Sequence, residues 1–346
     1  MRTVAFIDID IKDKIYPLTA AYLSGYARLT PELAHAWRFV HHPFLTTAEP
    51  EQVERLIDAL DAEVYAFSCY VWNMGLISRL VDYIAQRHPT KRVILGGPQV
   101  ANQAAKYLND RRGNVVICNG EGEKTFRDYL LALAQTSPEL TSVKGLSFLG
   151  ASGEVVTTPE VERIRNLDEI PSPFQNDLFN TREYLCTGYE TTRGCPYKCS
   201  YCYWGQLGAK PATFSDTRIH SDIRWIAEKA IRQLTFYDAN LGILPRDLDL
   251  SRFIANEKRQ TGWPKIIGFC MPSNPNKTIV KRVAEMCQIF TEAEFNFVCE
   301  IGIQTLSTDA LKRIDGRNLV KDNHDSYKWL QNELNANGIS SYVDII

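Results

Sequence analysis

The feature that most constrains the fold of this sequence is an alternation of short apolar runs with helical stretches over residues 3–133. Successive parallel strands need a crossover connection, which is usually a helix, so the alternation predicts a parallel α/β sheet with helices on both faces. The expected strands are residues 3–9, 37–42, 64–71, 92–97 and 115–120, and the expected helices lie near 18–29, from 51 onward, and near 76–86, 102–108 and 123–133.

The carboxyl ends of these expected strands carry the most unusual residues. Residues 68–73 follow the third strand, Gly96-Gly97 ends the fourth, and Gly120-Glu121 follows the fifth. If the strands adopt a flavodoxin-like order, ligands bind at this edge, near the topological switch point. A glycine pair alone could be only a tight strand-to-helix turn. Three small-residue loops on one edge favour a ligand, because glycine lets the backbone approach closely and helix N-termini offer amide donors.

A change of pattern after residue 133 predicts a domain boundary. Residues 143–158 are typical of a hairpin around Ser152-Gly153. Residues 167–174 (LDEIPSPF) favour an extended connector, because two prolines reject a helix. We therefore predict a Rossmann-like (flavodoxin-like) domain over residues 1–140, a hairpin and Pro-rich connector over 141–185, and a second α/β domain over 186–346.

Composition restricts the class of protein. Hydrophobic residues make up 45% of the 346 residues, which excludes a disordered chain, and 39 Lys and Arg against 41 Asp and Glu argue against a large nucleic-acid footprint. No apolar run reaches the roughly 18–20 residues of a spanning helix, and the N-terminus lacks a secretory signal. We therefore expect a cytoplasmic protein with no membrane partner, whose nine cysteines are ligands or small buried residues and not disulfides.

Three cysteines form a compact cluster of potential ligands. Cys195, Cys199 and Cys202 have the spacing C-x3-C-x2-C after a short apolar segment. A structural zinc site would need a fourth ligand at comparable spacing, and neither Cys186 nor His220 is well placed for that role. Three thiolates around a four-iron cluster would instead leave one iron open for a substrate or cofactor.

This spacing, with Tyr201 directly before the third cysteine, resembles the signature of the radical S-adenosylmethionine (SAM) superfamily. The resemblance implies a [4Fe-4S] cluster held by the three cysteines, with SAM bound to the open iron and Tyr201 beside it. It also implies reductive cleavage of SAM to methionine and a 5′-deoxyadenosyl radical, which abstracts hydrogen from a substrate.

The second domain as a whole resembles the partial (β/α)6 barrel of that superfamily. Its expected strands are residues 189–194, 234–240, 265–271, 295–305 and 339–346, with helices near 247–261 and 277–290, at 309, and near 325–335. Barrel chemistry lies at strand ends, and the resemblance assigns Asp238 to the SAM amino group. It assigns Glu300 and Gln304 to the SAM ribose and methionine, with ordinary strand polarity as the alternative. Because the superfamily usually has six strands, we expect the sequence to be a fragment.

The N-terminal half resembles the cobalamin-binding domain that is fused to some radical SAM barrels. The resemblance assigns cobalamin contacts to Ser68, Tyr70, Trp72, Gly96, Gly97, Gly120 and Glu121. The two adjacent glycines would let the nucleotide tail pass between sheet and helix. Cobalamin mutases carry D-x-H-x-x-G in their first loop, but residues 9–25 contain no histidine here. Bound cobalamin is therefore expected to be base-off, with no histidine ligand.

The other histidines and cysteines are expected to be structural. His35, His41 and His42 lie in or before the second strand, away from the loops described above, and isolated histidines usually pack or lie at the surface. A free cysteine in an apolar run behaves as a small hydrophobic residue. That description covers Cys69, Cys118, Cys270, Cys287 and Cys299.

Together these resemblances imply a cobalamin-dependent radical SAM enzyme that methylates an unactivated carbon of a small-molecule or peptide substrate. One alternative is a rearrangement, cyclisation or oxidation in which no methyl group moves. The other, from a different class, is a non-catalytic Fe–S electron carrier or sensor. The resemblance implies an electron donor such as flavodoxin or ferredoxin as a partner, and no nucleic acid.

Overall fold

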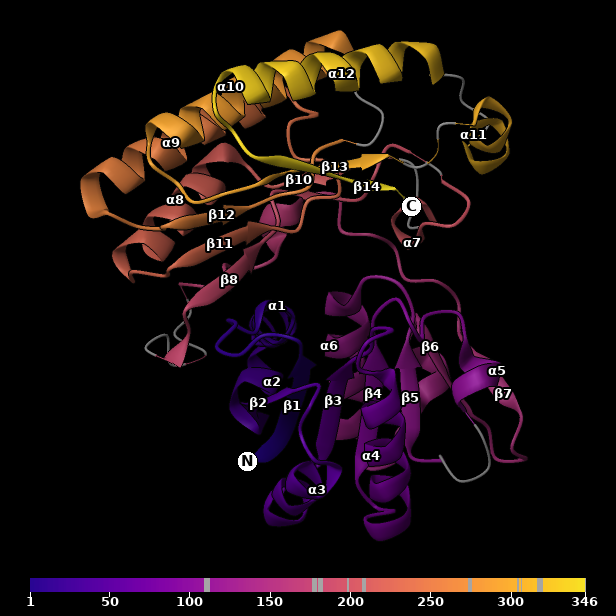
Figure 1. The fold of residues 1–346 in the computed structure, drawn as a ribbon. Coiled ribbons are helices and arrows are strands. Elements are labelled where there is room, and N and C mark those ends of the chain that lie inside the picture. The colour runs from indigo at the N-terminus through magenta and orange to yellow at the C-terminus, as the bar shows by residue number, and fades with distance from the viewer. Residues whose placement is uncertain are drawn as a thin grey trace. The chain divides into compact units, whose positions relative to one another are not determined.

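The computed structural model describes residues 1–108, 113–175, 179, 183–197, 199–206, 210–272, 276–303, 305, 307–315 and 320–345. The chain forms two compact units, drawn in Figure 1. The first consists of Met1–Ile164 with Glu169–Asn180, and the second of Arg165–Asp168 with Thr181–Ile346.

The first unit is built on a seven-stranded sheet of order β2-β1-β3-β4-β5-β6-β7. Its strands are β1 (Arg2–Asp10), β2 (Trp37–Leu45), β3 (Val64–Ser68), β4 (Arg92–Gly96), β5 (Val115–Cys118), β6 (Leu146–Leu149) and β7 (Val155–Thr157). The first five are parallel. Their order is that of flavodoxin-like sheets, with the topological switch between β1 and β3, and the predicted parallel sheet is confirmed.

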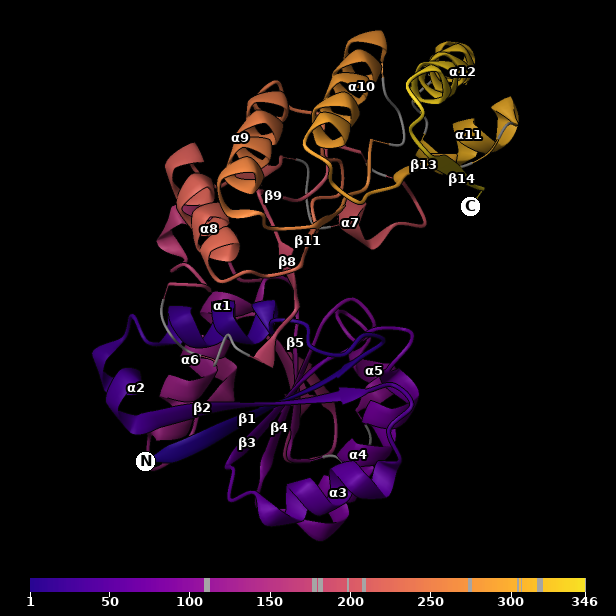
Figure 2. The same cartoon turned by 60° about the vertical axis from the view of Figure 1, so that its left-hand side comes forward.

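Helices cover both faces of this sheet, as Figure 2 shows for α1 and α6 on one face and α3 and α4 on the other. The helices are α1 (Leu18–Ala27), α2 (Pro31–Ala36), α3 (Pro50–Ala59), α4 (Met74–Arg87), α5 (Ala104–Tyr107) and α6 (Gly122–Ala134). Helix α2 was not predicted, because six residues are too few to show a helical period. Proline in its first turn and Glu32 beside it are nevertheless a typical helix start.

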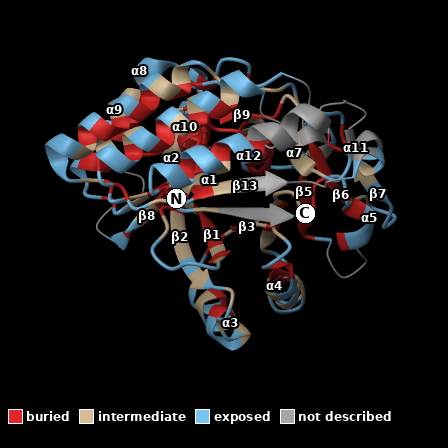
Figure 3. Ribbon diagram, turned by 45° about the horizontal axis from the view of Figure 1, so that its top comes forward, coloured by how far each residue is buried: buried red, intermediate tan, exposed pale blue. Residues whose placement is uncertain are grey.

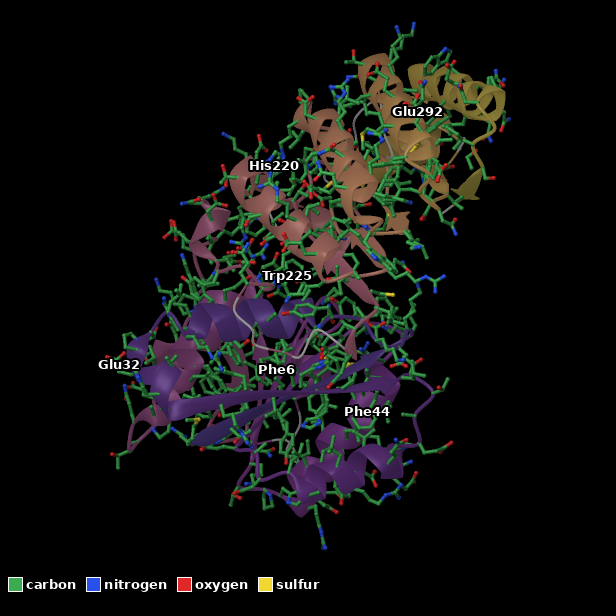
Figure 4. All side chains as sticks on the ribbon, turned by 90° about the vertical axis from the view of Figure 1, so that its left-hand side faces the viewer. Phe6, Glu32, Phe44, His220, Trp225 and Glu292 are labelled. Carbon is green, nitrogen blue, oxygen red and sulfur yellow. The ribbon has the colours of Figure 1, made fainter. Side chains whose placement is uncertain are left out.

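The two faces of β1 serve two hydrophobic cores, because successive side chains of a strand point to opposite faces. Phe6 packs toward α6, with its ring centroid 5.7 Å from that of Phe126. Ile7 belongs to the core on the other face, and Phe44 packs against the edge of that core. Figure 4 shows Phe6 among the packed side chains of this unit and Glu32 at its surface.

The predicted hairpin is β6–β7, and it joins the sheet of the first unit. Its strands pair antiparallel, and Gly153 has the positive φ of 84° that the turn requires. β6 also pairs antiparallel with β5. The hairpin that we assigned to the connector therefore extends the N-terminal sheet.

The second unit is built on short parallel strands. They are β8 (Cys186–Tyr189), β11 (Gln233–Phe236), β12 (Ile266–Gly268), β13 (Cys299–Ile303) and β14 (Ser341–Ile345). They form a sheet of order β12-β11-β8 and a pair β13-β14, and parallel bridges from Ile266 to Asn296 and from Cys270 to Glu300 connect the two. The first strand ends earlier than predicted, at Tyr189. Thr192–Arg193 instead forms β9, antiparallel to β10 (Ala212–Thr213).

Helices pack on one side of these strands (Figure 1). They include α8 (Asp216–Glu228), α9 (Arg246–Thr261), α10 (Lys277–Glu292) and α12 (Val320–Ala336), while α7 (Tyr203–Gln206) and α11 (Thr308–Asp315) are short. Figure 3 shows buried positions along α8, α9 and α10 alternating with exposed ones, as in amphipathic helices. Helix α8, which carries His220 and Trp225 (Figure 4), was not predicted. No helix of the described residues is long and apolar enough to cross a membrane.

Candidate functional site

The loops that follow β3 and β4 meet at the carboxyl edge of the first sheet. Ser68, the last residue of β3, pairs with Gly96, the last residue of β4. The amide of Cys69 then donates to the Gly96 carbonyl over 2.7 Å. The predicted cobalamin residues of these two loops are therefore neighbours in the structure.

Gly97 is required by this close approach of two backbones. Its φ is +102°, and a Cβ built on it would lie 2.6 Å from the Cys69 carbonyl oxygen. Gly120, after β5, also has a positive φ of 76°, but a Cβ there would meet nothing within 4 Å. Gly97 thus closes a tight loop contact, whereas Gly120 leaves open space at its Cα.

A partly exposed aromatic pair lies in the loop after β3. The rings of Tyr70 and Trp72 are stacked, with centroids 4.5 Å apart and planes at 7°. Trp72 is 50% exposed and Val71 is 76% exposed. An apolar stack of this kind fits contact with a flat ligand, because exposed aromatic groups that rise from a rigid loop favour binding.

Asn73 organises this loop from below, and sequence reasoning assigned it no role. Its buried amide donates to the carbonyls of Ile9 and Ser68, over 3.0 and 2.9 Å, and its oxygen accepts from the amide of Tyr70 over 2.8 Å. One side chain therefore links β1, β3 and the aromatic loop. An asparagine between a strand and a helix was the only sequence signal.

The loop after β5 is tied to residues 163–164, which follow the β6–β7 hairpin. The Glu121 carboxylate accepts from Arg163 over 2.7 Å and from the amide of Ile164 over 3.3 Å. Both charged side chains are largely buried. These bonds give the Glu121 side chain a structural role that the sequence did not indicate.

The three motif cysteines lie on the segment that follows β9. Cys195 and Cys199 are buried and Cys202 is partly exposed. The amide of Cys202 donates to the Cys199 carbonyl over 3.0 Å, and the amide of Ser200 donates to the Ile314 carbonyl over 2.9 Å. Tyr201, between them, is 49% exposed. The motif thus holds two buried cysteines and one that is partly exposed.

A buried amide contacts the first of these sulfurs. Asn240, on the segment after β11, donates its Nδ2 to Cys195 Sγ over 3.1 Å. A neutral thiol is a weak acceptor, whereas a thiolate accepts strongly. The donor therefore fits a sulfur that ligates a metal centre.

The described part of the chain contains no group of three His, Cys, Asp or Glu side chains arranged to hold one metal ion.

Asp238 lies two residues beyond β11, at the strand end where it was predicted, and is 4% exposed. Its carboxylate accepts from Thr191 twice, from the hydroxyl over 2.6 Å and from the amide over 3.1 Å. Burial raises the pKa of Asp238 to about 7, against the lowering effect of these bonds. Arg246 also donates to the Thr191 carbonyl, over 2.9 Å. Asp238 and Arg246 therefore both anchor the segment that leads into the cysteine motif.

The fourth-strand residues are only partly described. Glu300 is partly exposed on β13, and its backbone pairs with Cys270 and Tyr342. Gln304 lies outside the described residues. Cys270 is exposed, contrary to the expectation from its apolar surroundings, while Cys69, Cys118, Cys287 and Cys299 are buried as predicted.

The histidines of the second strand lie outside the loops described above. His41 pairs with Asp8 of β1 over 2.9 Å, and its ring packs edge-on against Phe179. Burial lowers the pKa of its neighbour His42. His35 contacts the carbonyl of Pro31 within α2.

Comparison with known proteins supports the sequence resemblance. Residues 6–130 match the family model of the B12 binding domain. Over its whole length the chain is 29% identical to the cobalamin-dependent radical SAM methyltransferase TokK of Streptomyces tokunonensis. It is likewise 31% identical to a 2-(S-pantetheinyl)-carbapenam-3-carboxylate methyltransferase of Streptantibioticus cattleyicolor. The chain spans about half the length of these relatives, 50% in each case.

A solved structure shows the same fold. The whole chain matches 49% of OxsB, a cobalamin-dependent S-adenosylmethionine radical enzyme, with a TM-score of 0.72 at 19% identity. Residues 6–130 therefore match the model of the B12 binding domain, and the chain is similar, along its entire length, to a cobalamin-dependent radical SAM methyltransferase and to a second protein named as a methyltransferase.

Proposed function

We propose that this chain forms the cobalamin- and SAM-binding part of a radical enzyme that transfers a methyl group to an unactivated carbon. The observation that carries the proposal is the similarity, over the whole chain, to two proteins named as methyltransferases. The buried amide on Cys195 and the exposed aromatic loop of the first unit support it. A small molecule or peptide is the proposed substrate, flavodoxin or ferredoxin the proposed electron donor, and the reducing cytoplasm the proposed location.

In the second unit, Cys195, Cys199 and Cys202 are the proposed ligands of a [4Fe-4S] cluster. When bound, such a cluster supplies the electron that cleaves SAM to methionine and a 5′-deoxyadenosyl radical. The proposed SAM contacts are Tyr201, Asp238, Glu300 and Gln304. Thr191 fixes the orientation of the Asp238 carboxylate, and each carboxylate oxygen keeps a second lone pair for an ammonium group.

In the first unit, the loops at the carboxyl edge of the sheet are the proposed cobalamin site. When bound, cobalamin supplies the methyl group that is transferred. Tyr70 and Trp72 offer a stacked apolar surface, and Ser68 lies at their base. Gly96 and Gly97, where the loops after β3 and β4 meet, are proposed contacts of the nucleotide tail, and Gly120 leaves open space beside it. Glu121 contributes its backbone, because Arg163 occupies its carboxylate. The loop after β1 contains no histidine, so cobalamin is proposed to bind base-off.

Anaerobic reconstitution with iron and sulfide tests the cluster. The wild-type chain is expected to develop the absorption of a [4Fe-4S] cluster, and Cys199→Ala is expected to lose it. Cys270→Ala, which removes an exposed thiol outside the motif, is the matched control and should keep the cluster. A cluster that survives in Cys199→Ala would remove this ligand assignment.

Product analysis separates methyl transfer from the alternatives. The protein loaded with hydroxocobalamin is given SAM, a one-electron reductant and a substrate that supplies the hydrogen atom and accepts the methyl group. It is expected to yield 5′-deoxyadenosine together with S-adenosylhomocysteine and the methylated substrate. Formation of 5′-deoxyadenosine alone would favour a rearrangement or oxidation. Formation of neither product would favour an electron carrier or sensor.

A further inference from the structure

The contact between Asn240 and Cys195 differs from an ordinary core contact. Asn240 is 8% exposed and Cys195 is 9% exposed, and the amide reaches the sulfur over 3.1 Å. A buried amide that donates to a neutral thiol gains little, because a thiol is a poor acceptor. The same bond to a sulfur that carries negative charge is strengthened by burial.

The segment that carries Asn240 is held from several sides. The amide of Leu241 donates to the Cys270 carbonyl over 3.1 Å, and the amide of Gly242 donates to Asp247 over 2.8 Å. From α10, Arg282 donates to the carbonyls of Gly242 and Ile243, each over 2.8 Å. The amide is therefore preorganised toward the sulfur by strand, helix and side-chain contacts.

The segment that carries the acceptor is tied directly to the segment that carries the donor. Thr191, four residues before Cys195, is anchored by Asp238, which lies two residues before Asn240, and by Arg246 of α9. Donor and acceptor thus lie on two segments that brace each other within one unit. A bond between two fixed groups is well suited to set the electronic properties of the sulfur, because neither group can relax away.

Building on the proposed function, we propose that Asn240 raises the reduction potential of the cluster by donating its amide to the sulfur of Cys195. Reduction adds one negative charge, part of which resides on the thiolate sulfurs. A hydrogen-bond donor stabilises the more negative state more strongly, so the donor favours the reduced form. Asn240 is a positioning residue in this proposal, because it acts through Cys195 and does not touch the reacting atoms.

An EPR-monitored redox titration of the reconstituted full chain tests this proposal. In Asn240→Leu, the ratio of reduced to oxidised cluster at a fixed potential is expected to fall about threefold to tenfold, and tenfold corresponds to about 59 mV for one electron. Asn240→Asp should lower the ratio at least as much, because a carboxylate removes the donor and adds negative charge. Asn337→Leu, which removes an exposed amide at the end of α12, is the matched control and should retain the wild-type potential.

The outcomes separate this proposal from the proposed function. A wild-type chain that forms no cluster would remove the proposed function, and the proposal about Asn240 with it. A cluster present in wild type and in Asn240→Leu at the same potential would overturn only the role of Asn240. If Asn240→Leu retains no cluster, the reduction potential of the nearly isosteric Asn240→Asp is compared with that of the wild type instead. An unchanged potential in Asn240→Asp would likewise overturn the role of Asn240.

Discussion

At the scale of single residues, the candidate sites are defined by buried polar groups and the partners that hold them. Asp238 is the clearest case, because burial opposes its charge while two bonds from Thr191 favour it. The sequence indicated that Asp238 lies at a strand end. It could not indicate Thr191 as the partner, because the two residues are far apart in the chain and meet only in the folded unit.

The raised pKa of Asp238 makes the stability of the second unit depend on pH. Between about pH 4 and pH 7 the folded chain holds a proton that the unfolded chain has released, so stability falls as pH rises. The side chain of Asp238→Asn cannot titrate. Between pH 5 and pH 8 the free energy of unfolding of this variant should fall by about 2–3 kcal/mol less than that of the wild type. Urea unfolding followed by circular dichroism at both pH values measures this. Asp249→Asn, an exposed carboxylate on α9, should behave as wild type, and equal pH dependence in all three proteins would contradict the prediction.

Gly97 and Gly120 allow a matched test of the cobalamin edge. Gly97→Ala should destabilise the chain by about 3 kcal/mol or more, because the new methyl group would strike the Cys69 carbonyl and φ is positive. Gly120→Ala has only the backbone cost of about 1–2 kcal/mol, because its surroundings are open. Urea denaturation gives both values. Equal losses would mean that the contact between the loops after β3 and β4 is not tight.

At the scale of elements, the loop between β3 and α4 gains its shape from one side chain. Asn73 satisfies three backbone groups of β1, β3 and the loop itself. A buried backbone group without a partner is costly, so the loop and the aromatic stack depend on this residue.

Asn73 and Trp72 are therefore expected to separate loop architecture from ligand contact. Asn73→Leu should destabilise the chain by about 2–4 kcal/mol and reduce the uptake of hydroxocobalamin, because three polar groups lose their partner. Trp72→Ala should change stability by less than about 1 kcal/mol, since half of the side chain is exposed, and yet weaken uptake. Unfolding midpoints and visible absorption after desalting measure the two effects. Unchanged uptake in Trp72→Ala would remove the indole from the site.

Element type was predictable in most segments with a long period or a strongly apolar run, although the 13-residue α8 was missed. The five parallel strands and the helices α3, α4, α6, α9 and α10 follow that rule. α2 is too short to show a period. The first strand of the second unit was placed too late, because Thr192–Arg193 satisfies its backbone by antiparallel pairing with β10 and not within the parallel sheet.

At the scale of the whole molecule, each of the two units carries one candidate site on its own strand ends. Hydroxocobalamin should protect the amides of residues 68–73, 96–101 and 119–122 from hydrogen exchange. The reason is that a ligand stabilises the state that binds it, and at a hundredfold excess over Kd this stabilisation is about 2.7 kcal/mol. The loop at 88–91, which precedes β4, lies at the amino edge of the same sheet and is the internal control. Protection at 88–91 with none at 68–73 would place cobalamin elsewhere.

The sequence by itself determined the parallel sheet of the first unit, the strand-end placement of the glycine loops, and the cysteine motif. These features are local, because a hydrophobic period, a turn and a ligand spacing are each encoded within a few neighbouring residues. The tertiary structure alone decided that the hairpin extends the first sheet, that Arg163 occupies the Glu121 carboxylate, and that Asn240 faces the Cys195 sulfur. Such pairings join residues about 30 to 45 positions apart, and a buried polar group finds its partner only when packing brings the segments together.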